Sequence, residues 1–397
     1  GDAPPDERRA LVEALGKLGG DEARVRLQAL EPGADAELAR RRDRALLIGE
    51  RDAKRGEESA IAIDVAPPSP VTVRLHCKEG LAGLLRDDLA THGLRGTALR
   101  DDTVELSLAR PWSALHASRL WIDGGIRVPL AGPSPSAIAD AITSPRVRAL
   151  LRAWTTGPIR WRLAVRGGHQ RSLVWRVAKE VGARAKELVN DPSQTTWDIA
   201  VDTSSTEHAL ELVPRRAADP RFSWRVAEVP AASHPTVAAA LALVAGARDG
   251  DRVWDPFCGS AAELVERARL GPCRSIVGSD IDDAALTAAQ KNLDAAGVTA
   301  TLVRDDARTY SPDRPGTIDL VITNPPLGSR VHVDAASLLV TTLPNIAKHL
   351  SPAGRLVWIT PAPRTTATAA EKLGLRMTRR FAVDLGGVRG QLERWER

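Results

Sequence analysis

The 397-residue sequence has few cysteines, few aromatic residues other than tryptophan, and no long apolar run. Its three cysteines, Cys77, Cys258 and Cys273, lack C-x-x-C spacing, which excludes a disulfide framework and a cysteine zinc site. Without about 18 consecutive apolar residues, no membrane span is expected. The acidic, polar start is unlike a signal peptide, so we expect a cytoplasmic protein. We also expect a monomer without a metal. Since 43% of residues are hydrophobic and 26% charged, the chain is expected to fold.

Positive charge is concentrated in one stretch. Residues 141–190 hold eleven basic and two acidic residues, although the whole chain has a net charge of only +5. Three tryptophans lie among them, and basic groups interleaved with aromatic rings suit a nucleic acid whose bases can stack. A second explanation stays open, because arginine outnumbers lysine 47 to 8, as biased codon usage would give, and tryptophans usually lie in the core. The candidate RNA-binding residues are Arg148, Arg152, Arg166 and Arg171.

The hydrophobic pattern predicts four parts. Residues 1–65 form a helical N-terminal extension, since Leu11, Leu15 and Leu18 share one helical face. Residues 71–130 alternate strands and helices in an order that is typical of a ferredoxin-like domain with one strand missed. A second small α/β module covers 131–215 and carries the basic stretch. The helices expected in these two modules are 81–89, 112–121, 136–153 and 170–188, and the strands are 71–75, 103–108, 126–130, 159–165 and 197–201.

Residues 225–397 show a regular strand–helix alternation, which predicts a parallel, doubly wound α/β sheet of the Rossmann-like kind. A terminal hairpin follows. The expected strands are 252–255, 275–280, 301–304, 318–323, 354–360, 377–383 and 390–395. Ligands of such sheets bind at the carboxyl ends of the strands, so the residues there are the candidates for function.

Acidic residues follow the first three of these strands. Asp255 precedes a glycine turn, Asp255-Pro-Phe-Cys-Gly-Ser-Ala261, that lacks the G-x-G-x-x-G order of dinucleotide binders. Asp280 can accept hydrogen bonds from both hydroxyls of a ribose, and Asp306 from an adenine amino group, with apolar Ile281 against the ring. Such residues also cap helices, but three at successive strand ends favour a nucleoside pocket.

The fourth strand ends in Asn324-Pro325-Pro326-Leu327-Gly-Ser-Arg330. Two prolines restrict the backbone, so that the Asn324 amide oxygen and the Pro325 carbonyl can accept two hydrogens from one planar amino group. An ordinary proline-rich turn is the alternative, and the position beside the pocket favours the functional interpretation.

The order Ser233-His-Pro-Thr236, DPFCGS, GSDID, DDA and NPPLGSR resembles class I S-adenosylmethionine-dependent methyltransferases that act on exocyclic amino groups. More narrowly, the NPP-x-G-x-R form resembles the THUMP-domain RNA methyltransferases that make N2-methylguanosine in tRNA and 23S rRNA. The resemblance is specific over 225–397. It is looser over 78–128, which resembles the family's ferredoxin-like domain, and over 131–215, which resembles its THUMP domain.

The resemblance implies S-adenosylmethionine as cofactor, an RNA partner (tRNA or rRNA) and a set of site residues. The cofactor set is Thr236, Asp255, Phe257, Gly259, Asp280, Ile281, Asp306 and Ala307. The acceptor base would meet Asn324, Pro325, Pro326 and Leu327, with Arg330 toward a phosphate or the guanine edge. The family usually has glycine at the position of Ala261 and an aromatic residue at that of Leu327.

Three hypotheses remain open on the sequence. The favoured one is a guanine-N2 methyltransferase acting on tRNA or 23S rRNA. The second keeps the cofactor but methylates adenine N6 in RNA or DNA. The third is a non-catalytic RNA-binding protein in which the changes at Ala261 and Leu327 have abolished activity.

Overall fold

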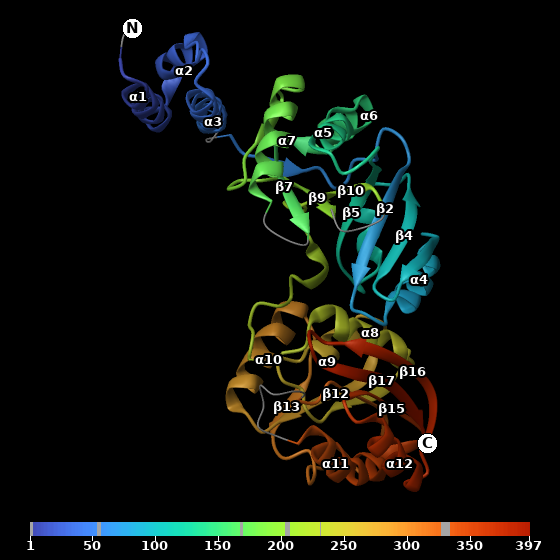
Figure 1. Ribbon diagram of the computed structural model, residues 1–397. Helices are drawn as coiled ribbons and strands as arrows, with labels where there is room; N and C mark the ends of the chain where they lie inside the picture. The colour runs from blue at the N-terminus through green and yellow to red at the C-terminus, as the bar shows by residue number, and fades with distance from the viewer. Residues whose placement is uncertain (1–2, 54–56, 167–169, 203–206, 231, 327–333) are drawn as a thin grey trace. The chain divides into compact units, whose positions relative to one another are not determined.

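The structure is a computed structural model that describes residues 3–53, 57–166, 170–202, 207–230, 232–326 and 334–397. The chain divides into two compact units, whose elements are labelled in Figure 1. Unit 1 comprises Gly1–Arg74, Ser107–Ala114 and Gly124–Ala218, and unit 2 comprises Leu75–Leu106, Leu115–Asp123 and Asp219–Arg397. Among the described residues, no helix is both long and apolar enough to cross a membrane.

Unit 2 is built on a seven-stranded sheet of order β13-β12-β11-β14-β15-β17-β16. The first five strands in this order are parallel, and β17 pairs antiparallel with β15 and β16. This arrangement confirms the predicted doubly wound sheet and terminal hairpin. The strands are β11 (Asp251–Asp255), β12 (Cys273–Asp280), β13 (Thr301–Arg304), β14 (Ile318–Thr323), β15 (Leu350–Thr360), β16 (Arg376–Asp384) and β17 (Arg389–Glu396).

Helices cover both faces of this sheet. Figure 1 shows α8 (Pro235–Ala245), α9 (Ala262–Ala268) and α10 (Asp283–Ala296) on one face, and α11 (Ala335–His349) and α12 (Pro363–Lys372) on the other. The central strands β11, β14 and β15 are therefore largely buried on both sides, which explains their mostly apolar sequences. The central core cluster includes Trp254, Val321, Leu356, Trp358 and Trp395, all fully buried.

Segments from the N-terminal half belong to unit 2 as well. They contain α4 (Ala82–Thr91), β3 (Gly96–Arg100) and the second half of the 3-10 turn Trp112–Ala117. Arg119 donates two hydrogen bonds of 2.6 and 2.7 Å to Glu266 of α9, whose carboxylate also accepts from the Trp224 indole at 3.1 Å. The Glu266 side chain is only 2% exposed, so the guanidinium compensates a charge that is buried within the unit.

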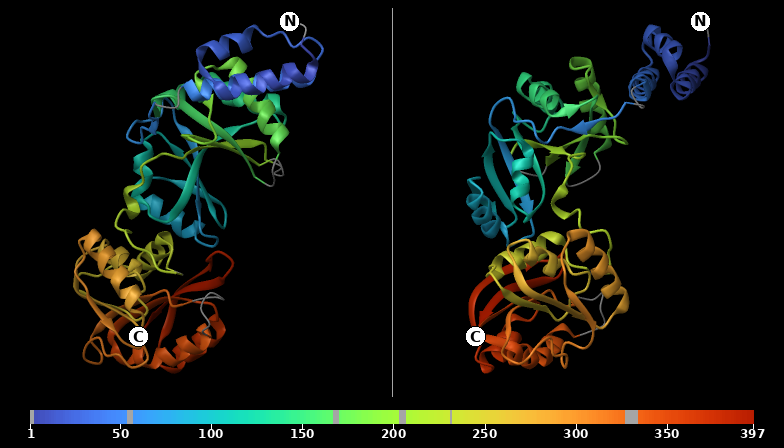
Figure 2. Two further views of the ribbon diagram at one scale, coloured as in Figure 1. Left: turned by 90° about the vertical axis from the view of Figure 1, so that its left-hand side faces the viewer. Right: turned by 180° about the vertical axis from the view of Figure 1, so that it is seen from behind.

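Three helices lie at the N-terminus of unit 1, in the region where the sequence predicted a helical extension. These helices are α1 (Pro5–Leu18), α2 (Gly20–Ala29) and α3 (Ala36–Ala53), which lie side by side in Figure 2. Val12, Leu27, Leu38 and Ala45 form their small core. A 2.6 Å ion pair joins Asp43 of α3 to Lys179.

All described strands between residues 71 and 214 except β6 form one sheet of order β3-β4-β2-β5-β10-β9-β7-β8. A two-stranded sheet pairs β1 (Ala60–Ile61) with β6 (Thr155–Thr156). The strands of the large sheet not yet named are β2 (Val71–Cys77), β4 (Thr103–Leu108), β5 (Trp121–Pro129), β7 (Ile159–Arg166), β8 (Leu188–Asn190), β9 (Trp197–Asp202) and β10 (Ala209–Pro214). The helices are α5 (Pro135–Thr143), α6 (Pro145–Ala153) and α7 (Arg171–Arg184).

These modules differ from the expectation in three places. The predicted helix 112–121 is a short 3-10 turn followed by β5, because the strand begins at Trp121. The predicted helix 136–153 is two helices, since Pro145 starts a new helix that Ser144 caps by accepting from the Val147 amide. The sheet is also continuous across the expected boundary at 130–131, because β5 pairs with β10 from Ile126 to Pro129.

Candidate cofactor and acceptor site

The turn after β11 is held in place by two carboxylates. Asp255 accepts a hydrogen bond from the Phe257 amide at 3.0 Å, and Asp280, at the end of β12, accepts one from the Gly259 amide at 2.9 Å. Gly259 has φ +48°, and nothing lies within 4 Å of the position that a Cβ would occupy. The turn therefore leaves open space beside exposed backbone, as close approach of a ligand requires.

Close packing fixes the base of the same turn. A Cβ on Gly278 of β12 would lie 2.9 to 3.1 Å from side-chain atoms of Leu302, Leu264 and Cys258, so a larger residue there would force these neighbours to shift. Ala261, which caps α9, has φ +66°, the only positive φ of a non-glycine residue in the described chain. That conformation costs an alanine about 1–2 kcal/mol, so the surrounding structure holds this turn in a strained form.

Two acidic side chains are buried together below the turn. Asp255 is fully buried, Glu263 of α9 is 3% exposed, and the Asp255 Oδ2 atom has no hydrogen-bond partner among the described residues. Burial, and next the Glu263 carboxylate, raise the pKa of Asp255 well above its ordinary value. Burial likewise raises the pKa of Glu263 to about 7. The pair therefore binds protons readily and would interact strongly with a cationic ligand group.

Asp280 holds the glycine turn through one hydrogen bond and can still accept hydrogen bonds from a ligand. Its second oxygen accepts from the Asp282 amide at 3.0 Å, so each carboxylate oxygen has one protein partner and keeps one lone pair for a ligand. The next residue, Ile281, is 68% exposed and therefore accessible to a ligand. The Asp280 carboxylate could accept hydrogen bonds from ribose hydroxyls, and the neighbouring Ile281 side chain could pack against the base attached to that ribose.

Asp306 already has protein hydrogen-bond partners, which the sequence did not indicate. Its carboxylate binds the Arg308 guanidinium through both oxygens and accepts the Arg308 amide at 2.9 Å. The ion pair lowers the pKa of Asp306. Ala307 beside it is 3% exposed. A base amino group would thus meet an acceptor that Arg308 already holds in place.

Asn324 follows β14 and is linked to the buried acids. Its Nδ2 atom donates to the Ser233 hydroxyl at 2.9 Å, and that hydroxyl donates to Glu263 Oε1 at 2.5 Å. Asn324 Oδ1 is buried without a hydrogen-bond partner among the described residues. Pro325 is buried and Pro326 half-buried, whereas Leu327 and Arg330 lie outside the described residues.

The remaining predicted cofactor residue, Thr236, starts α8 and is 1% exposed. Its hydroxyl lies 2.8 Å from His234 Nδ1, which also accepts the Thr236 amide. This contact fixes the segment that carries Ser233. Phe257 is half-buried within the turn.

Sequence reasoning missed two polar contributors, Glu263 and Asn292. Asn292 of α10 is fully buried, accepts from the Val226 and Ala227 amides at 2.9 Å, and donates to the Ser260 carbonyl at 3.0 Å. It therefore ties the glycine turn to the segment before α8. A polar residue on the apolar face of a helix was the available signal for Asn292.

The basic stretch of unit 1 is largely paired inside its own module. Arg148 and Arg152 both bind Glu187, and Arg166 binds Glu211, so three of the four candidate arginines already have carboxylate partners. Trp154 and Trp161 are buried and cannot stack on bases, as the core explanation predicted. Besides Arg146, which donates to the Pro70 carbonyl, the exposed basic residues of this stretch without an ion pair to any described residue are Arg171, Arg176 and Lys186.

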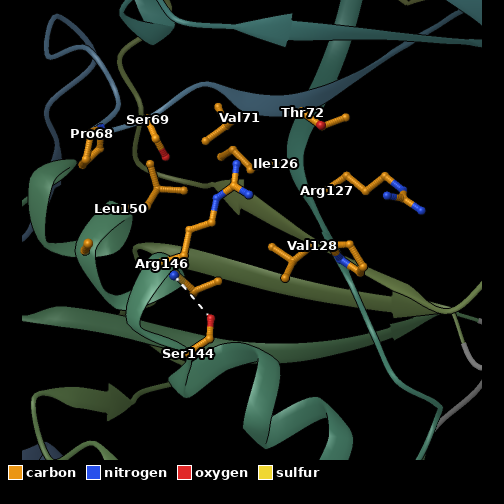
Figure 3. A pocket seen from close by; sticks show the side chains of 13 residues that line it. Pro68, Ser69, Val71, Thr72, Ile126, Arg127, Val128, Ser144, Arg146 and Leu150 are labelled. Carbon is orange, nitrogen blue, oxygen red and sulfur yellow. Dashed lines mark hydrogen bonds between the residues drawn. The ribbon is translucent and has the colours of Figure 1, made fainter.

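A separate cavity of about 210 Å³ opens in unit 1 beside β2, β5 and α6. Figure 3 shows apolar side chains such as Val71, Ile126 and Leu150 around it, with Arg146 reaching between them. Arg146 donates to the Pro70 carbonyl at 2.7 Å, and Arg127 pairs with Glu207 at 2.6 Å. The cavity wall is mostly apolar and contains no chemical group of the strand-end site. Among the described residues, no cluster of three or more His, Cys, Asp or Glu side chains could hold a metal ion.

Comparison with known proteins assigns the C-terminal part of unit 2. Residues 223–391 match the family described as RMKL-like, methyltransferase domain. The match contains the glycine turn, Glu263, Asp280 and Asn324. The strand-end site therefore lies within the region that matches this family.

Curated relatives are similar over this same region. The chain is 32% identical over 142 residues to the tRNA (guanine(10)-N2)-dimethyltransferase of Methanothermobacter thermautotrophicus, which covers 36% of this chain and 38% of that protein. It is 32% identical over 158 residues to the tRNA (guanine(6)-N2)-methyltransferase of Thermus thermophilus, which covers 39% and 47%. The chain thus spans less than half the length of these two relatives.

A solved structure extends the similarity to more of the fold. TrmN from Thermus thermophilus aligns with a TM-score of 0.65 and 23% identity, covering 82% of this chain and 99% of that one. At this identity the alignment speaks for the fold, which is the class I, Rossmann-like methyltransferase fold with an upstream α/β part.

Proposed function

We propose that the protein is an S-adenosylmethionine-dependent RNA methyltransferase that methylates an exocyclic base amine, namely guanine N2, in tRNA or alternatively in 23S rRNA. The observation that carries the proposal is the Asn324 amide, whose nitrogen is bound to Ser233 while its buried oxygen has no partner among the described residues. The relatives named as tRNA guanine-N2 methyltransferases match the region that contains this residue.

The strand-end residues fit the cofactor. Asp255 Oδ2 is a buried acceptor without a partner among the described residues, which suits the ammonium of the methionine part. Asp280 keeps lone pairs for ribose hydroxyls beside the exposed Ile281, and the space at Gly259 admits a ligand against the backbone. When bound, S-adenosylmethionine supplies an electrophilic methyl group on a sulfonium.

The chain's own contribution is to orient the acceptor. The lone pair of guanine N2 is delocalised into the ring, so the amine is a weak nucleophile. Hydrogen bonds from its two hydrogens to Asn324 Oδ1 and to the Pro325 carbonyl would localise the lone pair and direct it at the methyl carbon. Methylation leaves a positive charge on N2, which these dipoles stabilise until one proton is lost to solvent.

The base must leave its helix to reach this site. We propose that residues 131–215 act as a THUMP-like RNA-binding domain, supported by the exposed basic residues Arg171 and Arg176 on α7 and Lys186 just after it. In this proposal Leu327 offers an apolar surface to the flipped base.

The test is nucleoside mass spectrometry of total RNA incubated with the protein and labelled S-adenosylmethionine. N2-methylguanosine formed by the wild-type chain and lost in Asn324→Ala is the expected result. N6-methyladenosine instead would establish the adenine alternative. Cofactor binding without methylation of any RNA would favour the non-catalytic RNA-binding protein.

A further inference from the structure

Three side chains from separate parts of unit 2 form one continuous hydrogen-bonded chain. Asn324 follows β14, Ser233 precedes α8, and Glu263 lies in the first turn of α9. The Asn324 Nδ2 to Ser233 Oγ distance is 2.9 Å, and the Ser233 Oγ to Glu263 Oε1 distance is 2.5 Å. A buried acid is thus one hydroxyl away from the residue that is placed at the acceptor amine.

The hydrogens in this chain can be assigned from the chemistry of the groups. An ionised carboxylate only accepts, so Ser233 must direct its single hydroxyl hydrogen toward Glu263. Ser233 then has only lone pairs left for Asn324, and the amide must present its nitrogen to Ser233. The Asn324 oxygen consequently faces the other way, free to accept from an amine.

Protonation of Glu263 removes this constraint. A carboxylic acid can donate to the Ser233 oxygen, which releases the serine hydrogen to donate to Asn324 Oδ1. The amide can then turn over and present N–H groups toward the acceptor. Two donors facing each other cannot hydrogen-bond, so the amine would no longer be held.

We propose that Glu263 is a positioning residue for methyl transfer: in its ionised form, and through Ser233, it fixes the orientation in which Asn324 presents its amide oxygen to the acceptor amine. The inference rests on the proposed function for the identity of the group that Asn324 meets. Glu263 itself touches neither the acceptor nor the methyl group.

The surroundings of Glu263 place its ionisation in a useful range. Burial raises its pKa to about 7, and Glu266, one turn along α9, adds to the rise. The Ser233 hydrogen bond and the charge of Arg225 act in the opposite direction. Asp255 is electrostatically coupled to Glu263, and Cys258 is kept as a thiol by its own burial. The orienting form of Glu263 is therefore lost as the pH falls through neutrality.

The experiment compares single-turnover rates at saturating cofactor from about pH 6 to 9, a range that brackets the ionisation. The wild type should show an acid limb centred near pH 7. Glu263→Gln and Ser233→Ala should lose that limb and be slower by about tenfold at high pH, with little change in KM for RNA, since only orientation is lost. Ser233→Thr keeps the hydroxyl and should keep the limb.

Glu393→Gln is the matched control. Glu393 is another buried carboxylate with a raised pKa, but it accepts hydrogen bonds from the indoles of Trp358 and Trp395. This variant should retain the acid limb. An unchanged limb in Glu263→Gln, or its loss in Glu393→Gln, would overturn the inference.

A second measurement keeps this inference separable from the proposed function. The side-chain amide of ¹⁵N-labelled Asn324 should shift with pH near neutrality in the wild type and stay constant in Glu263→Gln. If no RNA is methylated but the amide titrates in this way, the proposed function fails while the coupling stands. If RNA is methylated but the amide does not titrate, the coupling fails alone.

Discussion

Replacing Asp280 by alanine separates cofactor recognition from the rest of the site. The change removes the acceptor of the Gly259 amide at 2.9 Å and the two lone pairs assigned to the ribose. Hydrogen bonds to a charged group contribute about 1.5–3 kcal/mol each, so two of them correspond to a loss of at least about 100-fold in cofactor affinity. In this variant the exposed Asp282 amide can hydrogen-bond to water instead. The loss of folding stability therefore comes mainly from the unsatisfied Gly259 amide and is about 1–3 kcal/mol.

Isothermal titration calorimetry with S-adenosylmethionine measures the expected loss, and RNA affinity should stay unchanged. Asp283→Ala is a matched control, because Asp283 is 69% exposed and pairs only with Arg304 at the surface. Such pairs contribute little, so cofactor affinity should be retained. Equal cofactor binding by Asp280→Ala and the wild type would refute the assignment of this strand end.

Three further predictions concern the acceptor, the RNA and the buried acid. Asn324→Ala should slow methyl transfer about 100-fold or more in single-turnover assays while RNA binding is kept, and Leu327→Phe should hold or raise the rate, since base stacking on an aromatic ring is worth about 1–3 kcal/mol. Charge reversal at the exposed, unpaired positions Arg171, Arg176 and Lys186 should make RNA binding less salt-dependent. The slope of log affinity against log salt should fall by about 0.7 per lost phosphate contact, and reversal of Arg148 and Arg152 should change it less. The folded-state pKa of Glu263 is raised from 4.5 to about 7, so its ionisation destabilises the fold as the pH rises through that window. Relative to the wild type, Glu263→Gln should therefore be more stable above pH 7 than it is near pH 5, by up to about 3 kcal/mol in the free energy of unfolding. Denaturant titrations at the two pH values measure this difference.

The sequence was most informative about the seven-stranded sheet of unit 2. Its central strands are largely buried on both faces, so their apolar runs are long and their ends are marked by acidic residues, as at Asp255 and Asp280. The strands of the upstream part were harder to predict. β3 is half exposed, with a threonine and two exposed residues at its end, and β8 is only three residues long, so neither shows a clear alternation.

The site shows a similar division. Residues at strand ends could be predicted because the topology itself brings them to one edge of the sheet. The link from Asn324 through Ser233 to Glu263 could not, because 91 and 30 residues separate the partners and no local pattern connects them. The pairing of Arg148 and Arg152 with Glu187 was hidden for the same reason, and net charge along the chain overstated the positive surface.

The Arg119–Glu266 ion pair limits how unit 2 could be transferred to another protein by gene fusion. A gene fusion that joined a foreign segment at residue 219 would carry Glu266 without its guanidinium partner, and removing one member of a buried ion pair costs about 3–5 kcal/mol. The same junction would discard the Glu79 carbonyl that accepts from the Asp384 amide at 3.2 Å. A gene fusion that keeps these contacts must therefore transfer residues 75–123 together with residues 219–397.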